Sequence, residues 1–202
     1  RMLHDALSPQ SPTPFGIIKP LGNSRAQEQS MLTVDNKTTR EKIHMNDKPF
    51  SISARFKTKT KKGATIFART SHEGGWERDG KAFFIGPGGL LYYDIGWKSV
   101  IYSPTKVNDG KWHHAIFTQD GDMCSMYLDG KISFMKRSFT QPDKDTHVLK
   151  IGYAHKKQFK AFPGEISQVN YYNSCISDAE AVKLTLNQKI NTPALFSWSP
   201  KK

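Results

Sequence analysis

The sequence predicts an all-β fold, either an antiparallel sandwich or a barrel, and three observations support this prediction. Apolar and polar residues alternate with a period of two in many short runs, turns rich in Gly and Asp separate these runs, and a single segment carries the signals of a helix. Many short strands without intervening helices are typical of packed or closed antiparallel sheets. With 202 residues, 37% of them hydrophobic, the chain is large enough to bury a core.

The clearest predicted strand is "KPFSISARFKTK", residues 48–59. Its apolar side chains fall on one face, at Phe50, Ile52, Ala54 and Phe56. Serine and basic residues occupy the other face, which is typical of a half-buried strand. Shorter strands are predicted between turns such as "GPGG", "NDGK" and "LDGK", at residues 31–34, 42–45, 64–69, 81–85, 90–95, 100–102, 113–119, 123–128, 132–134, 147–153 and 165–172.

One short helix is predicted near the end of the chain. Ser177 and Glu180 have the spacing of a capping box, and Ala181 and Leu184 supply an apolar side. The helix is expected to lie as a lid on a sheet edge or on one end of the sandwich.

The predicted domain covers residues 31–187 and is flanked by two segments without a regular pattern. Residues 1–30 hold four prolines between Pro9 and Pro20, which predicts an extended N-terminal arm or linker. Residues 188–202 form a tail in which Leu195, Phe196 and Trp198 are expected to dock on the domain. The first residues lack a signal-peptide pattern, so we expect a processed or excised piece whose compartment the sequence does not specify.

The net charge is strongly positive and unevenly distributed. The formal charge is +12, and residues 48–202 hold 24 Lys and Arg against 13 Asp and Glu. Such a field favours anionic partners such as sulfated or acidic glycans, nucleic acid or acidic lipid headgroups. No run of 18 apolar residues is present, so the sequence predicts no membrane span.

Cys124 and Cys175 are the two cysteines of the chain. Two are too few for a disulfide-built mini-domain, and their spacing matches no metal motif. One disulfide or two thiols would fit, and the shared parity of Cys124 with Met126 and Leu128 favours two separate buried thiols.

Three motifs follow one another in the second half of the chain: "DGKWHH" at residues 109–114, "YLDG" at 127–130 and "FPGEI" at 162–166, before "YYNSCIS" and the helix. Together they resemble the LamG-like, or concanavalin A-like, lectin/glucanase jelly-roll superfamily over residues 31–187. The resemblance implies a β-sandwich of two curved antiparallel sheets and, since members are mostly modules of larger proteins, an extracellular or cell-surface location. It implies no single ligand, because the superfamily includes sugar binders, glycosidases and adhesive modules.

The adjacent histidines His113 and His114 invite a metal or acid/base interpretation. Neighbouring strand residues point to opposite faces, and no further ligands follow at suitable spacing. We therefore predict structural roles, with His113 beside the core and the imidazole nitrogens tying strand to turn. Asp109 and Asp129 precede glycines and predict turns, and Trp112 is expected in the core.

Metal binding and catalysis are both predicted to be absent. Some LamG-type domains bind calcium at an acidic rim, and the loose candidates here are Asp94, Asp120, Asp122, Asp143 and Asp145. No calcium-loop motif joins them and the net charge opposes weak cation binding, so we expect no metal and no cofactor. Glycosidases need a close pair of carboxylates, and the Glu-x-Asp-x-Glu pattern of the catalytic branch is missing, so we predict no enzyme.

A basic strip is the first candidate binding surface. Residues 48–69 contain no acidic residue, and a shared parity predicts a ridge on one sheet face formed by Arg55, Lys57, Lys59 and Lys61. The ridge fits two interpretations, a solvated face that deters edge pairing or a docking strip for a sulfated glycan or another polyanion.

Aromatic residues between positions 76 and 102 are the second candidate surface, because their rings can stack on sugar faces. Several of them are expected in the core, whereas Trp76 and one of Tyr93 or Trp97 are expected to be exposed. The ligand-binding candidates from this region are Trp76, Tyr93, Trp97 and Tyr102.

The first functional hypothesis is a non-catalytic recognition module of a larger protein. It would bind carbohydrate, including acidic or sulfated glycans, or a glycosylated partner, through loops at one sandwich edge and the concave sheet face. The alternative is a structural or protein–protein interaction domain without sugar binding that contacts other domains of its parent protein. Polyanion or nucleic-acid binding through the basic face is a third, for which the charge fits but no nucleic-acid motif is present.

Overall fold

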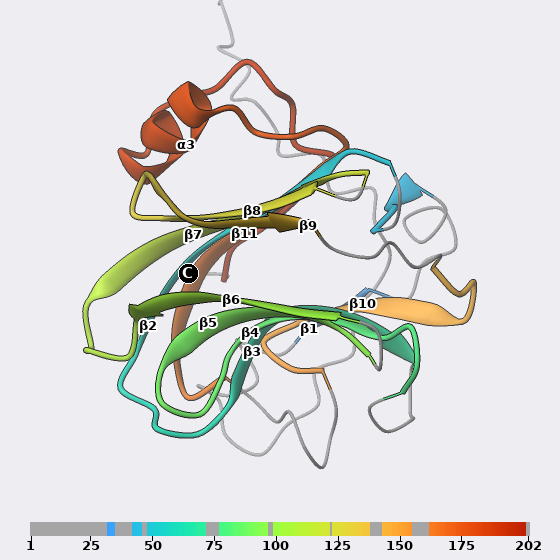
Figure 1. The fold of residues 1–202 in the computed structure, drawn as a ribbon, viewed down its shortest axis with the longest axis horizontal. Helices are drawn as coiled ribbons and strands as arrows, with labels where there is room; N and C mark the ends of the chain where they lie inside the picture. Colours follow the sequence, from blue (N-terminus) through green and yellow to red (C-terminus); the bar gives the residue numbers. More distant parts are fainter. Residues whose placement is uncertain are drawn as a thin grey trace, which may run out of the picture.

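Two antiparallel sheets pack face to face and one helix lies against the second of them (Figure 1). The structure is a computed structural model, and it describes residues 32–34, 42–45, 48–71, 77–96, 99–121, 123–137, 143–154 and 162–200. The predicted all-β jelly-roll sandwich is confirmed. The predicted arm, residues 1–30, lies outside the described residues.

The first sheet has six strands, in the order β1 (Leu32–Val34), β10 (His147–Ile151), β3 (Ala64–Ser71), β4 (Lys81–Ile85), β5 (Leu90–Ile95) and β6 (Ser99–Lys106). The second sheet also has six, in the order β12 (Phe196–Trp198), β11 (Gly164–Tyr172), β2 (Phe50–Thr58), β7 (Trp112–Asp120), β8 (Met123–Leu128) and β9 (Lys131–Arg137). Strands far apart in sequence therefore lie side by side, as β2 does between β7 and β11.

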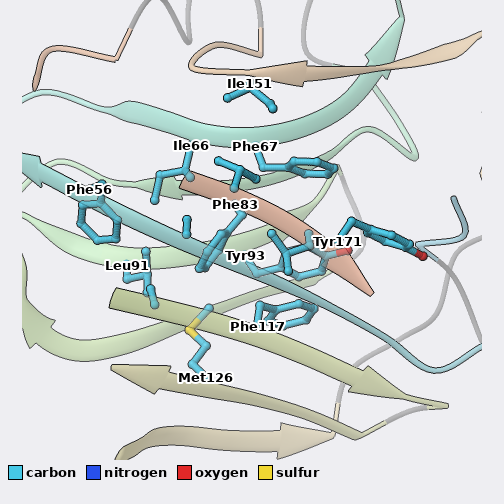
Figure 2. Packing of buried hydrophobic residues seen from close by; sticks show 14 of the residues in the cluster. Phe56, Ile66, Phe67, Phe83, Leu91, Tyr93, Phe117, Met126, Ile151 and Tyr171 are labelled. Atoms are coloured by element: carbon cyan, nitrogen blue, oxygen red, sulfur yellow. The ribbon is translucent and has the colours of Figure 1, made fainter. Parts of the chain in front are cut away.

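The core lies between the inner faces of the two sheets (Figure 2). The inner face predicted for residues 48–59 is confirmed, because Phe50, Ile52 and Phe56 of β2 are fully buried in the core. The strand is more than half-buried, since Ser51 and Ser53 of its other face are also fully buried. From the first sheet, Tyr93 stacks on Phe117 of the second sheet with ring centroids 3.8 Å apart. Each such buried aromatic side chain contributes about 1.5–3 kcal/mol of hydrophobic stabilisation.

The helix α3 (Asp178–Thr185) begins at the predicted capping box. The Ser177 hydroxyl accepts a hydrogen bond from the Glu180 backbone N–H, and the Glu180 carboxylate accepts one from the Ser177 N–H, each at 3.3 Å. Ala181 of the helix is buried against the outer face of the second sheet, beside Ile116 and Tyr172. The helix thus covers part of that face and also contacts the edge strand β9, in agreement with the predicted lid on a sheet edge (Figure 1). Its eight residues are too few to cross a bilayer, and the described part of the chain holds no other helix able to do so.

The structure differs from the predicted strands at several places. Residues 43–45 carry no strand, although Ile43 and Met45 are buried in the core. The strand predicted at 100–102 extends over Ser99–Lys106 and includes Pro104. A proline is tolerated there because β6 is an edge strand, so only one of its sides is hydrogen-bonded to a neighbouring strand. The tail forms the unpredicted strand β12, in which Phe196 pairs with Tyr171 of β11, so the expected docking of the tail is confirmed.

Both cysteines are free, which confirms the prediction of two separate thiols. Cys124 is buried in the core, whereas Cys175 is only half-buried. Desolvation raises the pKa of the Cys175 thiol, so the neutral form dominates at pH 7.

Candidate functional site

The structure separates the predicted binding residues into two groups on opposite sides of the sandwich. Arg55 and Lys57 lie on the outer face of the second sheet, because their neighbours along β2 point into the core. Tyr102 lies on the outer face of the first sheet and is 47% exposed, next to the buried Ile101. The core separates the two groups, so they do not form one site. Trp76 and Trp97 lie outside the described residues.

Tyr93, predicted as a ligand contact, lies in the core and is 1% exposed. Its ring stacks on Phe117 and also contacts the ring of Phe50, with centroids 6.4 Å apart. A ligand on the protein surface does not reach it, so this prediction was wrong. The sequence does not decide which of Tyr92 and Tyr93 is buried, because either register of β5 buries one of them. The pairing of Phe83 with Tyr93 in the sheet places Tyr93 on the buried face.

Trp112 was predicted to be in the core, and this prediction was wrong. It is 37% exposed on the outer face of the second sheet, where it pairs with Lys57. The alternation along β7 predicts the exposure of Trp112. Ala115 and Phe117 point into the core, so residues at even-numbered positions of the strand point outward.

Two cations lie over the Trp112 ring and complete a surface that we name the Trp112 patch, formed by Arg55, Lys57 and Trp112. The Arg55 guanidinium carbon is 5.3 Å and the Lys57 Nζ is 5.0 Å from the ring centroid. Each contact of this kind contributes about 0.5–1 kcal/mol at an exposed site. Lys57 Nζ also forms an ion pair with Glu165 Oε1 of β11 at 2.7 Å. These contacts restrain two long cationic side chains, which lowers the entropy lost when they bind a ligand.

Lys59 and Lys61 do not continue the predicted ridge on the sheet face, because β2 ends at Thr58. Both are exposed in the connection that follows. The aliphatic part of Lys59 lies against Gly110, at the approach to β7. Two residues of the basic strip, Arg55 and Lys57, therefore lie on the sheet, and Lys59 and Lys61 lie beyond its end. The prediction that all four form a ridge on one sheet face was wrong.

His113 ties two turns together, as predicted. Its Nδ1 lies 2.9 Å from Asp129 Oδ2 and its Nε2 lies 3.0 Å from Asp109 Oδ1. The hydrogen bond with Asp129 is the main cause that raises the pKa of His113 above its ordinary value. The pKa values of both carboxyl groups are lowered, that of Asp109 by hydrogen bonds to the Lys111 backbone and to His113.

His114 points to the opposite face, where helix α3 covers it. Its Nδ1 lies 3.3 Å from Thr185 Oγ1, and desolvation lowers its pKa to about 4. The two histidines do not converge. Within the described ranges, no group of three or more His, Cys, Asp or Glu side chains is arranged to hold a metal ion.

The candidate calcium ligand Asp143 instead binds cations of the protein itself. Its Oδ1 accepts a hydrogen bond from Lys81 Nζ at 2.7 Å and lies 3.5 Å from Arg69 Nε, and its Oδ2 accepts one from the Met45 N–H at 2.8 Å. Lys81 and Arg69 are buried. This carboxylate anchors the segment before β10 to the end of the first sheet. Asp122 lies outside the described residues.

Three glutamates of the described residues make separate structural contacts. Glu165 pairs with Lys57, and Glu77 Oε1 lies 3.1 Å from His147 Nε2. Glu180 caps α3 and accepts hydrogen bonds from the N–H and hydroxyl of Thr192. Glu73 lies outside the described residues.

Comparisons with known proteins agree with this architecture. A family model described as the concanavalin A-like lectin/glucanases superfamily matches residues 32–182. The CBM40 module of the Ruminococcus gnavus IT-sialidase, bound to α2,3 sialyllactose, is 14% identical with a TM-score of 0.60, and the alignment covers 73% of this chain and 85% of that one. A comparison with curated proteins finds no match.

Two further structures with the same fold come from animals and bacteria. A SAP-like pentraxin from Limulus polyphemus is 15% identical with a TM-score of 0.53, covering 71% of this chain and 73% of that one. The NanB sialidase of Streptococcus pneumoniae is 15% identical with a TM-score of 0.59, covering 75% of this chain and 26% of that one. At sequence identities of 14% and 15%, these comparisons show a shared fold and no more.

Proposed function

Because the chain belongs to the concanavalin A-like lectin/glucanases superfamily, we propose that it is a non-catalytic module of a larger protein that binds acidic or sulfated glycans. The binding surface is the Trp112 patch on the outer face of the second sheet. The observation that carries this proposal is the exposed Trp112 ring with Arg55 and Lys57 within 5.3 Å of its centroid.

The chemistry of the Trp112 patch fits an anionic sugar. A guanidinium group donates two parallel hydrogen bonds to a carboxylate or sulfate, and an ammonium group adds a compact charge. The exposed part of an indole supplies apolar contact area for the C–H groups of a sugar ring. The net charge of +12 raises the local concentration of anionic ligands and their association rate.

The comparison with solved structures adds support of a general kind. The R. gnavus CBM40 module binds α2,3 sialyllactose, an acidic sugar, on a sandwich of the same fold. The fold can therefore present an acidic-sugar site, although the residues that do so here are argued from this chain alone.

The engaged carboxylates support a non-catalytic role. A glycosidase needs an acid and a second carboxylate about 5–10 Å apart and directed at one bond. In this chain Glu165 is ion-paired with Lys57 and Glu180 caps a helix, so the two carboxylates make separate contacts and are not directed at one bond.

The test is a glycan array of sulfated, sialylated and neutral sugars, probed at low and high salt. We expect binding to the anionic sugars that falls with salt, and a loss of about tenfold in affinity for Arg55→Ala and for Trp112→Ala. Lys106→Ala is the matched control, since Lys106 is an exposed cation on β6 of the first sheet. Equal binding by Arg55→Ala and Lys106→Ala would refute the assignment to the Trp112 patch.

A protein-interaction role is the second candidate function. It is favoured by two exposed apolar residues of the helix region, Val182 and Leu186, which are 46% and 61% exposed. Absence of binding to every sugar on the array, with the folded state verified by circular dichroism, would favour this role. Nucleic acid added as a competitor tests whether any salt-sensitive binding is specific to glycans.

A further inference from the structure

Three aromatic rings form a row on the outer face of the first sheet. The first sheet is the one that lies away from α3 (Figure 1). Phe84 of β4 stacks on Tyr92 of β5 with centroids 5.3 Å apart and an interplanar angle of 15°. Tyr92 in turn contacts Tyr102 of β6, with centroids 5.5 Å apart. Phe84 is buried and Tyr102 is half exposed, so the row runs from a covered end to an open one.

The register of the sheet produces this row. Phe84 pairs with Tyr92 and Tyr92 pairs with Tyr102, so the three side chains lie next to one another on one face. The Tyr92 ring also lies against the backbone of Gly86, where a Cβ atom would be 2.4 Å from Tyr92 Cε2. A side chain at position 86 would collide with the Tyr92 ring, so glycine is required there. The contacts with Phe84 on one side and Tyr102 on the other restrain the Tyr92 ring before any ligand binds.

A carboxylate lies on the same face, next to Tyr92 along β5 and opposite Val100 of β6. Asp94 follows Tyr92 by two residues along β5, so both side chains point to the same face, about 7 Å apart along the strand. Asp94 is half-buried, and no group within the described residues donates a hydrogen bond to it. Desolvation raises its pKa to about 6, so the group is mainly ionised at pH 7. Val100, which pairs with Asp94 on the edge strand β6, is 45% exposed.

We propose that Tyr92, Tyr102 and Asp94 form a second binding site, for an uncharged sugar with adjacent hydroxyl groups. The ring of Tyr102 stacks on the C–H face of the sugar, and Tyr92 extends the platform. The Asp94 carboxylate accepts hydrogen bonds from two neighbouring hydroxyls of the sugar. These bonds replace the hydrogen bonds to water that the carboxylate oxygens lose through partial burial. The same negative charge repels sulfate and carboxylate groups, so the site selects against the ligands that fit the Trp112 patch.

The two sites are independent, because they lie on opposite faces of the sandwich and carry opposite charge. Binding at the Trp112 patch is expected to fall with salt, whereas binding at the Tyr102 site depends on stacking and short hydrogen bonds and is expected to be salt-insensitive. A negative result for anionic glycans at the Trp112 patch therefore does not decide whether the Tyr102 site binds an uncharged sugar, and the reverse also holds.

The experiment is a titration of the purified chain with methyl glycosides of glucose, galactose, mannose and N-acetylglucosamine, followed by calorimetry. We expect at least one to bind at neutral pH, with the affinity reduced about tenfold or more in Tyr102→Leu and in Asp94→Asn. Tyr102→Leu retains apolar cover but removes the ring, and both variants are first verified as folded by thermal melting. Lys106→Ala on β6 is the control expected to bind normally.

The pH profile separates a direct role of Asp94 from a structural one. The affinity of the unmodified chain is expected to fall as the pH decreases through about 6, because protonation of Asp94 removes an acceptor. Asp94→Asn is expected to show no such fall. No binding of any of the four glycosides, or unchanged affinity in both Tyr102→Leu and Asp94→Asn, would overturn the proposal.

Discussion

The two outer faces of the sandwich differ in cover and in charge, although both belong to six-stranded antiparallel sheets with the same alternation. On the second sheet, α3 buries Ile116 and Tyr172, and the uncovered part presents Arg55 and Lys57. On the first sheet, an aromatic row leads to the carboxylate of Asp94. The core requires apolar residues only on the inner faces, so the outer positions are free to differ and can carry separate functions.

The largest expected effect on the free energy of unfolding comes from Asp143, which anchors the segment before β10 to the first sheet. Asp143→Ala removes the carboxylate that Lys81 and Arg69 share, and both of these cations are buried. Breaking a buried ion pair from one side costs about 3–5 kcal/mol, so we expect the free energy of unfolding in urea to fall by that amount. Asp145→Ala, at an exposed position two residues away, is the control and is expected to change it by less than about 0.5 kcal/mol. Similar values for the two variants would show that the carboxylate of Asp143 does not anchor this segment.

A matched pair of substitutions tests the difference in cover between the faces. Ile116→Ala leaves a cavity between the second sheet and α3, and we expect a loss of about 2–4 kcal/mol. Val100→Ala, at a 45% exposed position on the edge strand β6 of the first sheet, is expected to cost less than about 0.5 kcal/mol. Chemical denaturation of both variants checks this, and a small effect of Ile116→Ala would mean that α3 does not pack on the sheet.

The smallest expected effect is an opposite pH dependence of the two adjacent histidines. Folding raises the pKa of His113, so its contribution to stability is complete below the unfolded pKa of about 6.5 and is lost as the pH rises through the folded value. Folding lowers the pKa of His114 to about 4, so its contribution is present above about 6.5 and is lost as the pH falls towards 4.

Thermal melts between pH 7.5 and 4.5 therefore distinguish the two residues. Relative to the unmodified chain, His113→Gln should lose more stability on acidification, because the imidazole whose protonation strengthens the contacts with Asp109 and Asp129 is missing. His114→Gln should lose less, because no buried neutral imidazole has to be protonated. Parallel profiles for both variants would contradict the assignment of the two rings to opposite environments.

Much of the fold was predictable because strand alternation and turn chemistry act locally. The pattern of residues 48–59 defines which side of β2 is buried, and Ser177 with Glu180 defines where α3 begins. The structural role of His113 also followed from local spacing, since Asp109 lies four residues before it. β12 was not predictable, because its three residues form a strand only where β11 provides a partner.

The candidate sites were less predictable, because each combines residues from different strands. Trp112 was misplaced by treating a large aromatic residue as core instead of following the alternation of β7. The row of Phe84, Tyr92 and Tyr102 depends on the registers of β4 with β5 and β5 with β6, which include a bulge between Leu90 and Tyr92.

The sequence by itself determined the fold class, the inner face of the strands, the cap of α3 and the excess of positive charge, because these depend on residue type and local spacing. The tertiary structure alone decided that Arg55 and Lys57 meet Trp112, that Tyr93 is buried, and that Tyr102 joins Tyr92 beside Asp94. The physical reason is register: a shift of one residue between strands turns every side chain to the other face, and register is defined by the packing of the whole sandwich.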